Sequence, residues 1–383
     1  MTIGLLFASL VLQPVWWMGL IREWRTSNHR IRAERRTFGS AVYQDQYELR
    51  HYLSQSLVLG VLASLLSILV GVTVPITWWI MYTVLALLGM MALPAGGPLI
   101  VLVISIAGYF ANQVYGFWQP DETTLTQLGF SDWLPANPNF VAVATIALLL
   151  VSIWLYRIGG RYNAPQVLTK QRGQKVAEYR FNELAVIPML VLVPGDWFVS
   201  HTSFWPTLMV GQHRMTLLFL PLVIGLRWTI LKQVPRVALV QLARKVLVLG
   251  IVGLVLTVIS RFVPVSTPWL LGGLVIGYGL VLGSERLRDQ HRDFWFSDVN
   301  RGVRVIGIQP RTPAAKMALN IGDIILECNH VPVNNEDDFY RALLQDATYC
   351  HLRIQEPDGE LKVSETAIFA NAPHEIGVVL FQQ

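Results

Sequence analysis

The chain has little charge and almost no cysteine. Asp, Glu, Lys and Arg make up 14% of its 383 residues, whereas hydrophobic residues make up 53%. Soluble globular proteins carry about 25% charged residues, so the composition indicates a protein that lies mostly in a membrane. The two cysteines, Cys328 and Cys350, have no CxxC or Cys/His spacing, which argues against a zinc site.

Sequence signatures of catalysis are also missing. A membrane zinc protease needs HExxH, but the single His374-Glu375 pair has no second histidine one helical turn later. No GxSxG elbow and no Walker A sequence occurs, and the glycines from Gly277 to Gly283 lack the dinucleotide-binding spacing. We therefore expect no enzymatic activity, no metal and no cofactor.

Long apolar runs dominate the first 283 residues instead. Each is long enough for a membrane-spanning helix, and this pattern predicts a polytopic α-helical membrane domain over residues 1–283 with about nine spans. The predicted spans are 3–21, 53–70, 76–93, 97–115, 139–156, 184–200, 215–231, 246–262 and 268–283. Four prolines interrupt residues 184–231, so a total of seven or eight spans is the alternative to nine.

The distribution of Lys and Arg predicts the orientation. Three segments, 22–50, 157–183 and 232–245, are rich in Lys and Arg, whereas 116–138 has none and carries three acidic residues. Cytoplasmic loops are typically basic, so nine spans place the N-terminus outside and the C-terminus in the cytoplasm. Residues 1–293 hold 23 Lys and Arg against 13 Asp and Glu, and this excess belongs to the membrane loops. It indicates contact with membrane lipid and gives no reason to expect nucleic acid.

Residues 301–383 are different in character, after a juxtamembrane connector at 284–300. An apolar strand leads into Thr312-Pro313-Ala314-Ala315, and Leu319-Asn320-Ile321-Gly322-Asp323 precedes a second strand. These paired motifs resemble the bacterial type of PDZ domain, a small α+β fold that binds peptide strands. In the connector, Phe294–Phe296 could cover a sheet edge or lie at the membrane surface, and the surface is the favoured prediction.

The end of the chain predicts the peptide-binding site. PDZ domains hold a peptide carboxylate with a hydrophobic-Gly-hydrophobic loop just before the groove strand, and Glu375-Ile376-Gly377-Val378 fits this form. The groove strand would then be the last strand of the chain, so the domain would be circularly permuted. The predicted helix at 336–346 would form the other wall through Glu336, Tyr340 and Leu343, with Phe339 and Ala342 toward the core. The alternative is that Gly377 is an ordinary glycine of an edge strand.

The many-span layout, the Arg-rich segment 22–50 and the terminal HEIGVVL together resemble MinJ-like cell-division topological determinants. The resemblance implies a non-enzymatic scaffold in the cell membrane, enriched at septum and poles. It would bridge DivIVA, which gathers at curved membrane, and MinD, which acts in division-site selection. Two alternatives remain: a regulatory subunit of a membrane protease, and a transporter with a sensing PDZ domain, for which Asp196 is the candidate intramembrane charge.

Overall fold

The computed structural model describes residues 13–38, 41–95, 97–118, 139–162, 164–169, 175–195, 207–210, 213–291, 296–297, 299, 301–346, 348–368 and 376–381. The membrane half contains helices α2 (Pro14–Phe38), α3 (Tyr47–Val70), α4 (Ile76–Ala92), α5 (Pro98–Tyr115), α7 (Phe140–Ile158), α9 (Pro235–Phe262) and α10 (Thr267–Gln290), with the short 3₁₀ turn η2 (Pro264–Ser266). Its strands are β1 (Pro165–Thr169), β2 (Lys175–Pro194), β3 (Thr207–Val210) and β4 (His213–Ile230).

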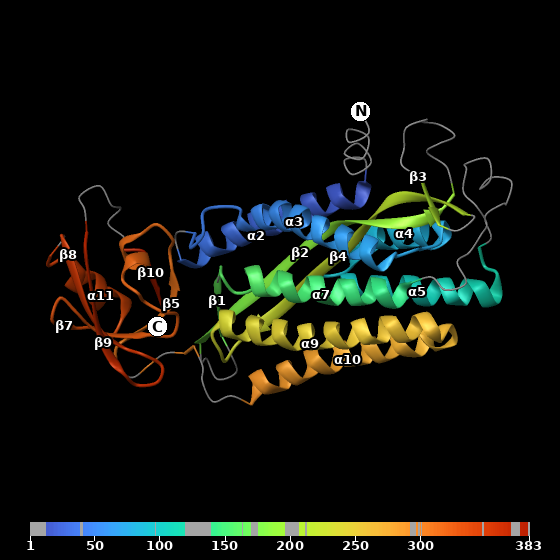
Figure 1. Cartoon of the computed structure of the whole chain (residues 1–383). Helices are drawn as coiled ribbons and strands as arrows, with labels where there is room; N and C mark the ends of the chain where they lie inside the picture. Colours follow the sequence, from blue (N-terminus) through green and yellow to red (C-terminus); the bar gives the residue numbers. More distant parts are fainter. Residues whose placement is uncertain are drawn as a thin grey trace.

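A long antiparallel hairpin runs through the middle of the membrane half (Figure 1). Strands β2 and β4 pair continuously from Tyr179↔Ile230 to Pro194↔Met215. The prediction of helical spans at 184–200 and 215–231 is therefore wrong within the described residues. Both strands are buried along most of their length, so their sequences are continuous apolar runs without alternation. Such a run looks the same whether it is a buried strand or a buried helix.

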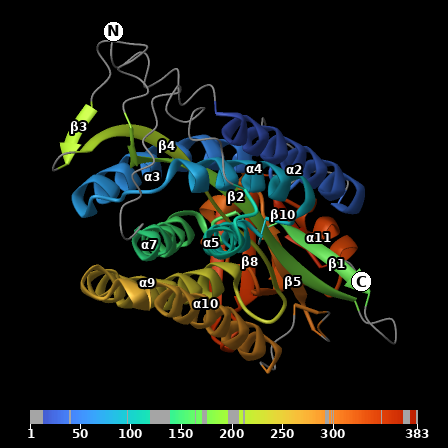
Figure 2. The same cartoon turned by 90° about the vertical axis from the view of Figure 1, so that its right-hand side faces the viewer.

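Helices cover both sides of this hairpin. Figure 2 shows α2 on one side and α3 beside α7 on the other, with α9 and α10 packed beyond α7. Five helices of the described chain, α3, α5, α7, α9 and α10 (the last together with η2), are long and apolar enough to cross a membrane, and α4 is a shorter apolar helix. Their outward faces expose large apolar side chains such as Leu69 and Phe262, as expected of surfaces that face lipid.

Neighbouring helices satisfy the outer edges of the hairpin. The Leu190 N–H donates to the Ser64 hydroxyl (3.1 Å), and the Val223 N–H donates to the Tyr82 hydroxyl (3.0 Å). In apolar surroundings an unpaired backbone group costs several kcal/mol. A sheet edge among these helices is therefore stable only when such contacts pair its backbone groups. The facing prolines Pro188 and Pro221 have no N–H, and they reduce the number of donors that the edges must satisfy.

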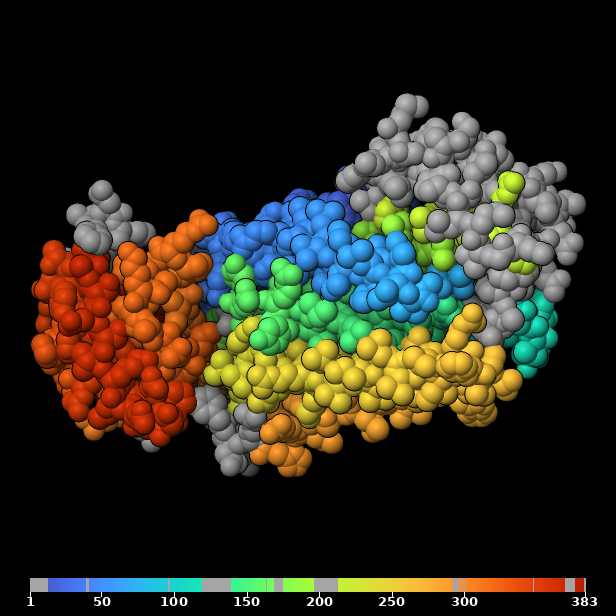
Figure 3. All heavy atoms as spheres, viewed as in Figure 1, coloured from blue at the N-terminus to red at the C-terminus, as the bar shows by residue number. Residues whose placement is uncertain are grey.

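The C-terminal domain is a separate small unit at one end of the elongated membrane half (Figure 3). Its elements are β5 (Val303–Ile308), η3 (Pro313–Lys316), β6 (Ile324–Cys328), β7 (Val331–Pro332), α11 (Glu336–Leu343), β8 (Tyr349–Gln355), β9 (Leu361–Ala367) and β10 (Val378–Leu380). The strands form one sheet in the order β10-β5-β6-β8-β9, with β7 paired to β6. The end of the chain thus forms a small α+β domain, as predicted, and α10 continues into the predicted connector as far as Gln290.

We expect Ser64→Ala to destabilise the membrane half by about 1–3 kcal/mol, because it leaves the part-buried Leu190 N–H without an acceptor. Ser260→Ala is the matched control, since the Ser260 hydroxyl bonds only to Thr257 O in its own helix. Thermal unfolding of the detergent-solubilised protein would measure both. Equal stability of the two variants would contradict the role assigned to Ser64.

Candidate functional site

Helix α11 packs one face onto the sheet of the C-terminal domain. It begins at the N-cap Asn335, whose side-chain oxygen accepts a hydrogen bond from the Asp338 N–H (2.7 Å). As its spacing predicts, Phe339 and Ala342 are buried in the domain core. Leu343 is buried with them and is only 5% exposed, so it belongs to the core as much as to any groove.

The other predicted groove residue of this helix, Tyr340, is partly buried. It packs against the same core cluster, and its ring meets the Phe339 ring edge-on at 5.5 Å. Glu336 opens the helix and is also partly buried. The structure therefore places both residues on the helix predicted to carry them, with Tyr340 between core and surface.

Strand β10, the last strand of the chain, pairs antiparallel with β5, the first strand of the domain. It ends the strand order, so within the described residues its other edge has no strand partner. Val378 lies in this strand, directly after Ile376 and Gly377. Glu375 is outside the described residues. An end strand with a free edge is the feature that strand addition of a peptide requires.

The side chains of β10 and its flanking residues alternate between two cores. Ile376, Val378 and Leu380 are buried in the core of the C-terminal domain. Val379 and Phe381 instead belong to the core of the membrane half. A strand directs successive side chains to opposite faces, so this one strand joins the two cores.

Phe296 completes this junction. It is fully buried, its ring meets the Tyr179 ring at 5.0 Å, and its carbonyl accepts a hydrogen bond from the Ala177 N–H (2.8 Å). The favoured prediction for Phe296, a place at the membrane surface, is therefore wrong, because β2 and the C-terminal domain enclose it. Phe294 and Trp295 lie outside the described residues.

Hydrogen bonds also connect the two domains at this junction. The Tyr179 hydroxyl donates to Ile306 O (2.8 Å), and Arg304 Nε donates to Ser297 O (3.1 Å). Burial lowers the pKa of the Arg304 guanidinium. The C-terminal domain is thus fixed to the end of the hairpin by apolar and polar contacts together.

Gly377 has a structural requirement of its own. Its φ is +87°, and a Cβ at this position would lie 2.2 Å from Thr312 Oγ1. The carbonyl groups of Ile376 and Gly377 accept hydrogen bonds from the Ala314 N–H (3.0 Å) and the Gln309 N–H (2.8 Å). The loop before β10 is therefore bound to the Thr312-Pro313-Ala314-Ala315 segment, and no side chain fits at residue 377.

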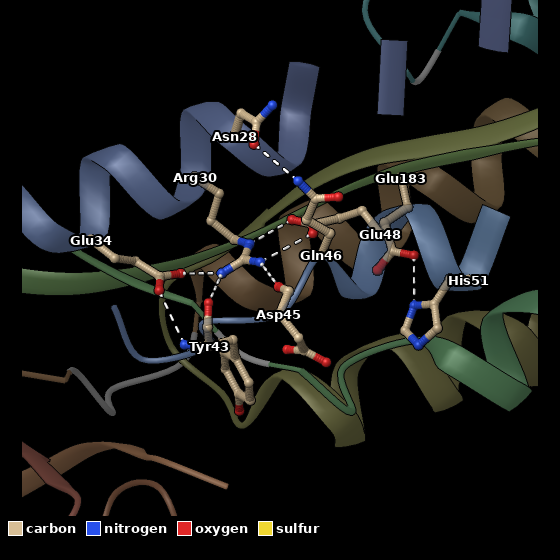
Figure 4. Close-up of polar contacts among 9 residues, drawn as sticks. All are labelled: Asn28, Arg30, Glu34, Tyr43, Asp45, Gln46, Glu48, His51 and Glu183. Atoms are coloured by element: carbon tan, nitrogen blue, oxygen red, sulfur yellow. Dashed lines mark hydrogen bonds and ion pairs between the residues drawn. The ribbon is translucent and has the colours of Figure 1, made fainter. Parts of the chain in front are cut away.

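A cluster of charged and polar side chains around Arg30 lies in the membrane half, between α2 and the start of α3 (Figure 4). Arg30 donates to Glu48 through Nε (2.6 Å) and Nη2 (3.1 Å), and to Glu34 through Nη1 (2.9 Å). It also donates to the carbonyls of Tyr43 (2.9 Å) and Asp45 (2.8 Å). Every polar group of the guanidinium is therefore matched by an oxygen.

The basic composition of residues 22–50 predicts a cytoplasmic loop, and it does not predict this cluster. The available signal was the spacing of Arg30 and Glu34, which lie one helical turn apart. The contact between His51 Nδ1 and Glu183 (2.9 Å) joins residues 132 positions apart, so no local pattern indicates it. The described residues contain no group of three or more metal-ligand side chains. Asp196, the candidate transporter residue, lies outside them.

We expect Gly377→Ala to destabilise the C-terminal domain by about 2–4 kcal/mol, because it adds both a strained φ and a clash with Thr312. Gly359→Ala is the control, because Gly359 also has a positive φ of +95° but has open space around its Cβ position. Limited proteolysis of the full-length protein would compare the two. Similar protection of both variants would show that the clash with Thr312 does not add to the destabilisation of the domain.

We expect Arg30→Met to destabilise the membrane half by about 3–5 kcal/mol, because it leaves Glu34 and Glu48 buried without a counter-charge. Arg50→Met removes an exposed ion pair with Asp45 and should cost less than about 1 kcal/mol. Thermal unfolding in detergent would measure both changes. If Arg30→Met is as mild as Arg50→Met, the cluster does not stabilise the fold.

Comparison with known proteins agrees with this organisation. The family description "PDZ domain" matches residues 287–355, a range that ends before β9 and β10. The Cell division topological determinant MinJ of Bacillus subtilis is 27% identical over 371 residues, which cover 96% of this chain and 92% of that protein. The Probable cell division topological determinant MinJ of Lacticaseibacillus paracasei is 29% identical over 397 residues, 98% of each chain. No solved structure matches. The chain is thus similar over nearly its whole length to MinJ cell division topological determinants, and it carries a C-terminal PDZ domain.

Proposed function

We propose that this protein is a membrane-anchored scaffold that helps to place the division site by recruiting partner proteins through its PDZ domain. The observation that carries the proposal is the similarity to MinJ proteins over 96–98% of the chain, which includes both the membrane half and the PDZ domain. It acts without catalysis, and its partners are a DivIVA-like protein of curved membrane and a MinD-like protein. Its place is the cell membrane, with enrichment at septum and poles.

The arrangement of the basic segments supports a cytoplasmic PDZ domain. The three Lys- and Arg-rich segments run from α2 into α3, from the end of α7 into β2, and from β4 into α9. These α2–α3, α7–β1 and β4–α9 connections lie at the end of the membrane half that holds the PDZ domain (Figure 1). The Tyr115 end of α5, which leads into the acidic segment 116–138, lies at the opposite end. Basic segments favour the cytoplasmic side, so this orientation leaves the N-terminus outside.

The free edge of β10 supports a peptide groove. A partner peptide would add a strand there and contact α11, with Glu375, Ile376, Gly377 and Val378 around its carboxylate and with Tyr340 and Leu343 along its side chains. In this proposal the domain is circularly permuted, since the groove strand ends the chain instead of opening the domain.

For topology, we expect a cysteine introduced between residues 121 and 132 to react with a membrane-impermeant thiol reagent in intact cells. A cysteine replacing Asp358, in the turn between β8 and β9, should react only after permeabilisation. The reason is the side preference of Lys and Arg. Labelling of the second site in intact cells would reverse the orientation and remove a cytoplasmic PDZ domain from the proposal.

For recruitment, we expect Tyr340→Ala to reduce cross-linking of the full-length protein to its division partners in cells by about tenfold, as loss of a central aromatic contact does. Leu344→Ala, at the C-cap of the same helix, is the matched control, because Leu344 is 70% exposed and outside the core cluster. Mass spectrometry of the cross-linked products would identify the partners. Recovery of a protease in place of division proteins would favour a protease subunit, and equal recovery from both variants would place the groove elsewhere.

A further inference from the structure

A polar cavity of about 250 Å³ lies at the PDZ end of the membrane half. Its walls come from α2, the start of α3, the segment around Tyr162, and strands β1, β2 and β4. A water molecule occupies about 30 Å³ of liquid, so the volume suits a small polar ligand better than one or two waters. The cavity is outside the PDZ domain, and recruitment of a peptide does not use it.

Each acidic side chain that lines this cavity has a hydrogen-bond or ion-pair partner. Glu48 accepts two hydrogen bonds from Arg30, and Glu183 lies 2.9 Å from His51. Near the opening, Arg180 pairs with Glu178. Because these acids have partners, they do not set the preference of the cavity by themselves.

Five other polar side chains line the cavity, and within the described parts of the chain none of them has a hydrogen-bond or ion-pair partner. They are Thr26, His29, Gln166, Asn182 and Arg227. Asn182 and Arg227 are direct partners across β2 and β4, so their side chains are held by a rigid pair of strands. All five can donate hydrogen bonds, and Arg227 adds a permanent positive charge.

We propose that this cavity is a binding site for a phosphate group, with Arg227 as its principal ligand. An exposed guanidinium without a counter-ion, next to amide and hydroxyl donors, is the chemistry that recognises phosphate oxygens. The phosphate can belong to the headgroup of an anionic phospholipid or to a small soluble phosphate. Residues of the basic segments 22–50 and 157–183 line the cavity, and these segments belong to the proposed cytoplasmic surface, where anionic lipid headgroups also lie.

The test uses the full-length protein in a non-ionic detergent and three probes: dioctanoyl phosphatidylglycerol, dioctanoylglycerol, which lacks the phosphate, and inorganic phosphate. Binding is followed by thermophoresis at fixed ionic strength. We expect a phosphate-bearing probe to bind and Arg227→Gln to weaken it by about tenfold or more. Arg227→Lys, which keeps the charge but loses the planar donor pair, should lie between the two.

Arg32→Gln is the matched control, because Arg32 is exposed on α2 and does not line the cavity. It removes the same charge and should leave binding unchanged. Arg227 is exposed as well, so the melting temperature of the unliganded Arg227→Gln protein should equal that of the wild type. This comparison separates loss of binding from loss of folding.

Selective binding of phosphatidylglycerol identifies a lipid headgroup, and binding of inorganic phosphate with the same sensitivity to Arg227→Gln identifies a soluble phosphate. Either result supports the site. Equal weakening by Arg227→Gln and Arg32→Gln overturns it, because the attraction would then be general surface charge. Binding of dioctanoylglycerol as tightly as phosphatidylglycerol, or no binding of any probe, also overturns it.

Discussion

The membrane half depends on one constraint: the long β2–β4 hairpin lies among apolar helices, so its outward backbone groups need partners. Strands β2 and β4 satisfy each other across the hairpin, and neighbouring helices and segments bond several of the outward groups. Ser64, Trp79 and Tyr82 supply side-chain partners, and the Val72–Val74 segment adds backbone bonds to Leu192. Directional hydrogen bonds therefore fix the helices to the hairpin, in addition to the apolar packing between them.

The same hairpin determines where the PDZ domain lies. Its β2 end holds Phe296 and Tyr179, and against these rest β5 and β10 of the PDZ domain. A domain on a flexible tether would sample many orientations, whereas these contacts hold this domain in one orientation relative to the hairpin. Because β10 contributes side chains to both cores, the proposed groove strand is also the strand that fixes the domain.

The phosphate site that we propose is built on this frame as well. Strands β2 and β4 place Asn182 and Arg227 beside each other, and α2 brings Thr26 and His29 to the same cavity. The neighbouring Arg30 pairs with Glu34 and Glu48, so Glu48 does not face the cavity as an unpaired acid. A scaffold that meets the membrane at this end would thus have a lipid or metabolite contact next to its peptide-binding domain.

Several features could be predicted from local sequence because local physics determines them. Apolar length identified α3, α5, α7, α9 and α10, and the paired motifs around Thr312 and Gly322 indicated the PDZ domain. Helical spacing placed Phe339 and Ala342 in its core. The Lys and Arg distribution grouped the three basic segments, which the structure also brings to one end.

By itself, then, the sequence determined the membrane character and the type of the C-terminal domain, since these follow from hydropathy and short motifs. Only the tertiary structure decided that 184–194 and 215–230 are strands, because burial on both faces removes the alternation that marks a strand. It alone decided the burial of Phe296, the clash that excludes a side chain at Gly377, and the pairing of His51 with Glu183. Each of these is a contact between distant segments, which no local pattern in the chain encodes.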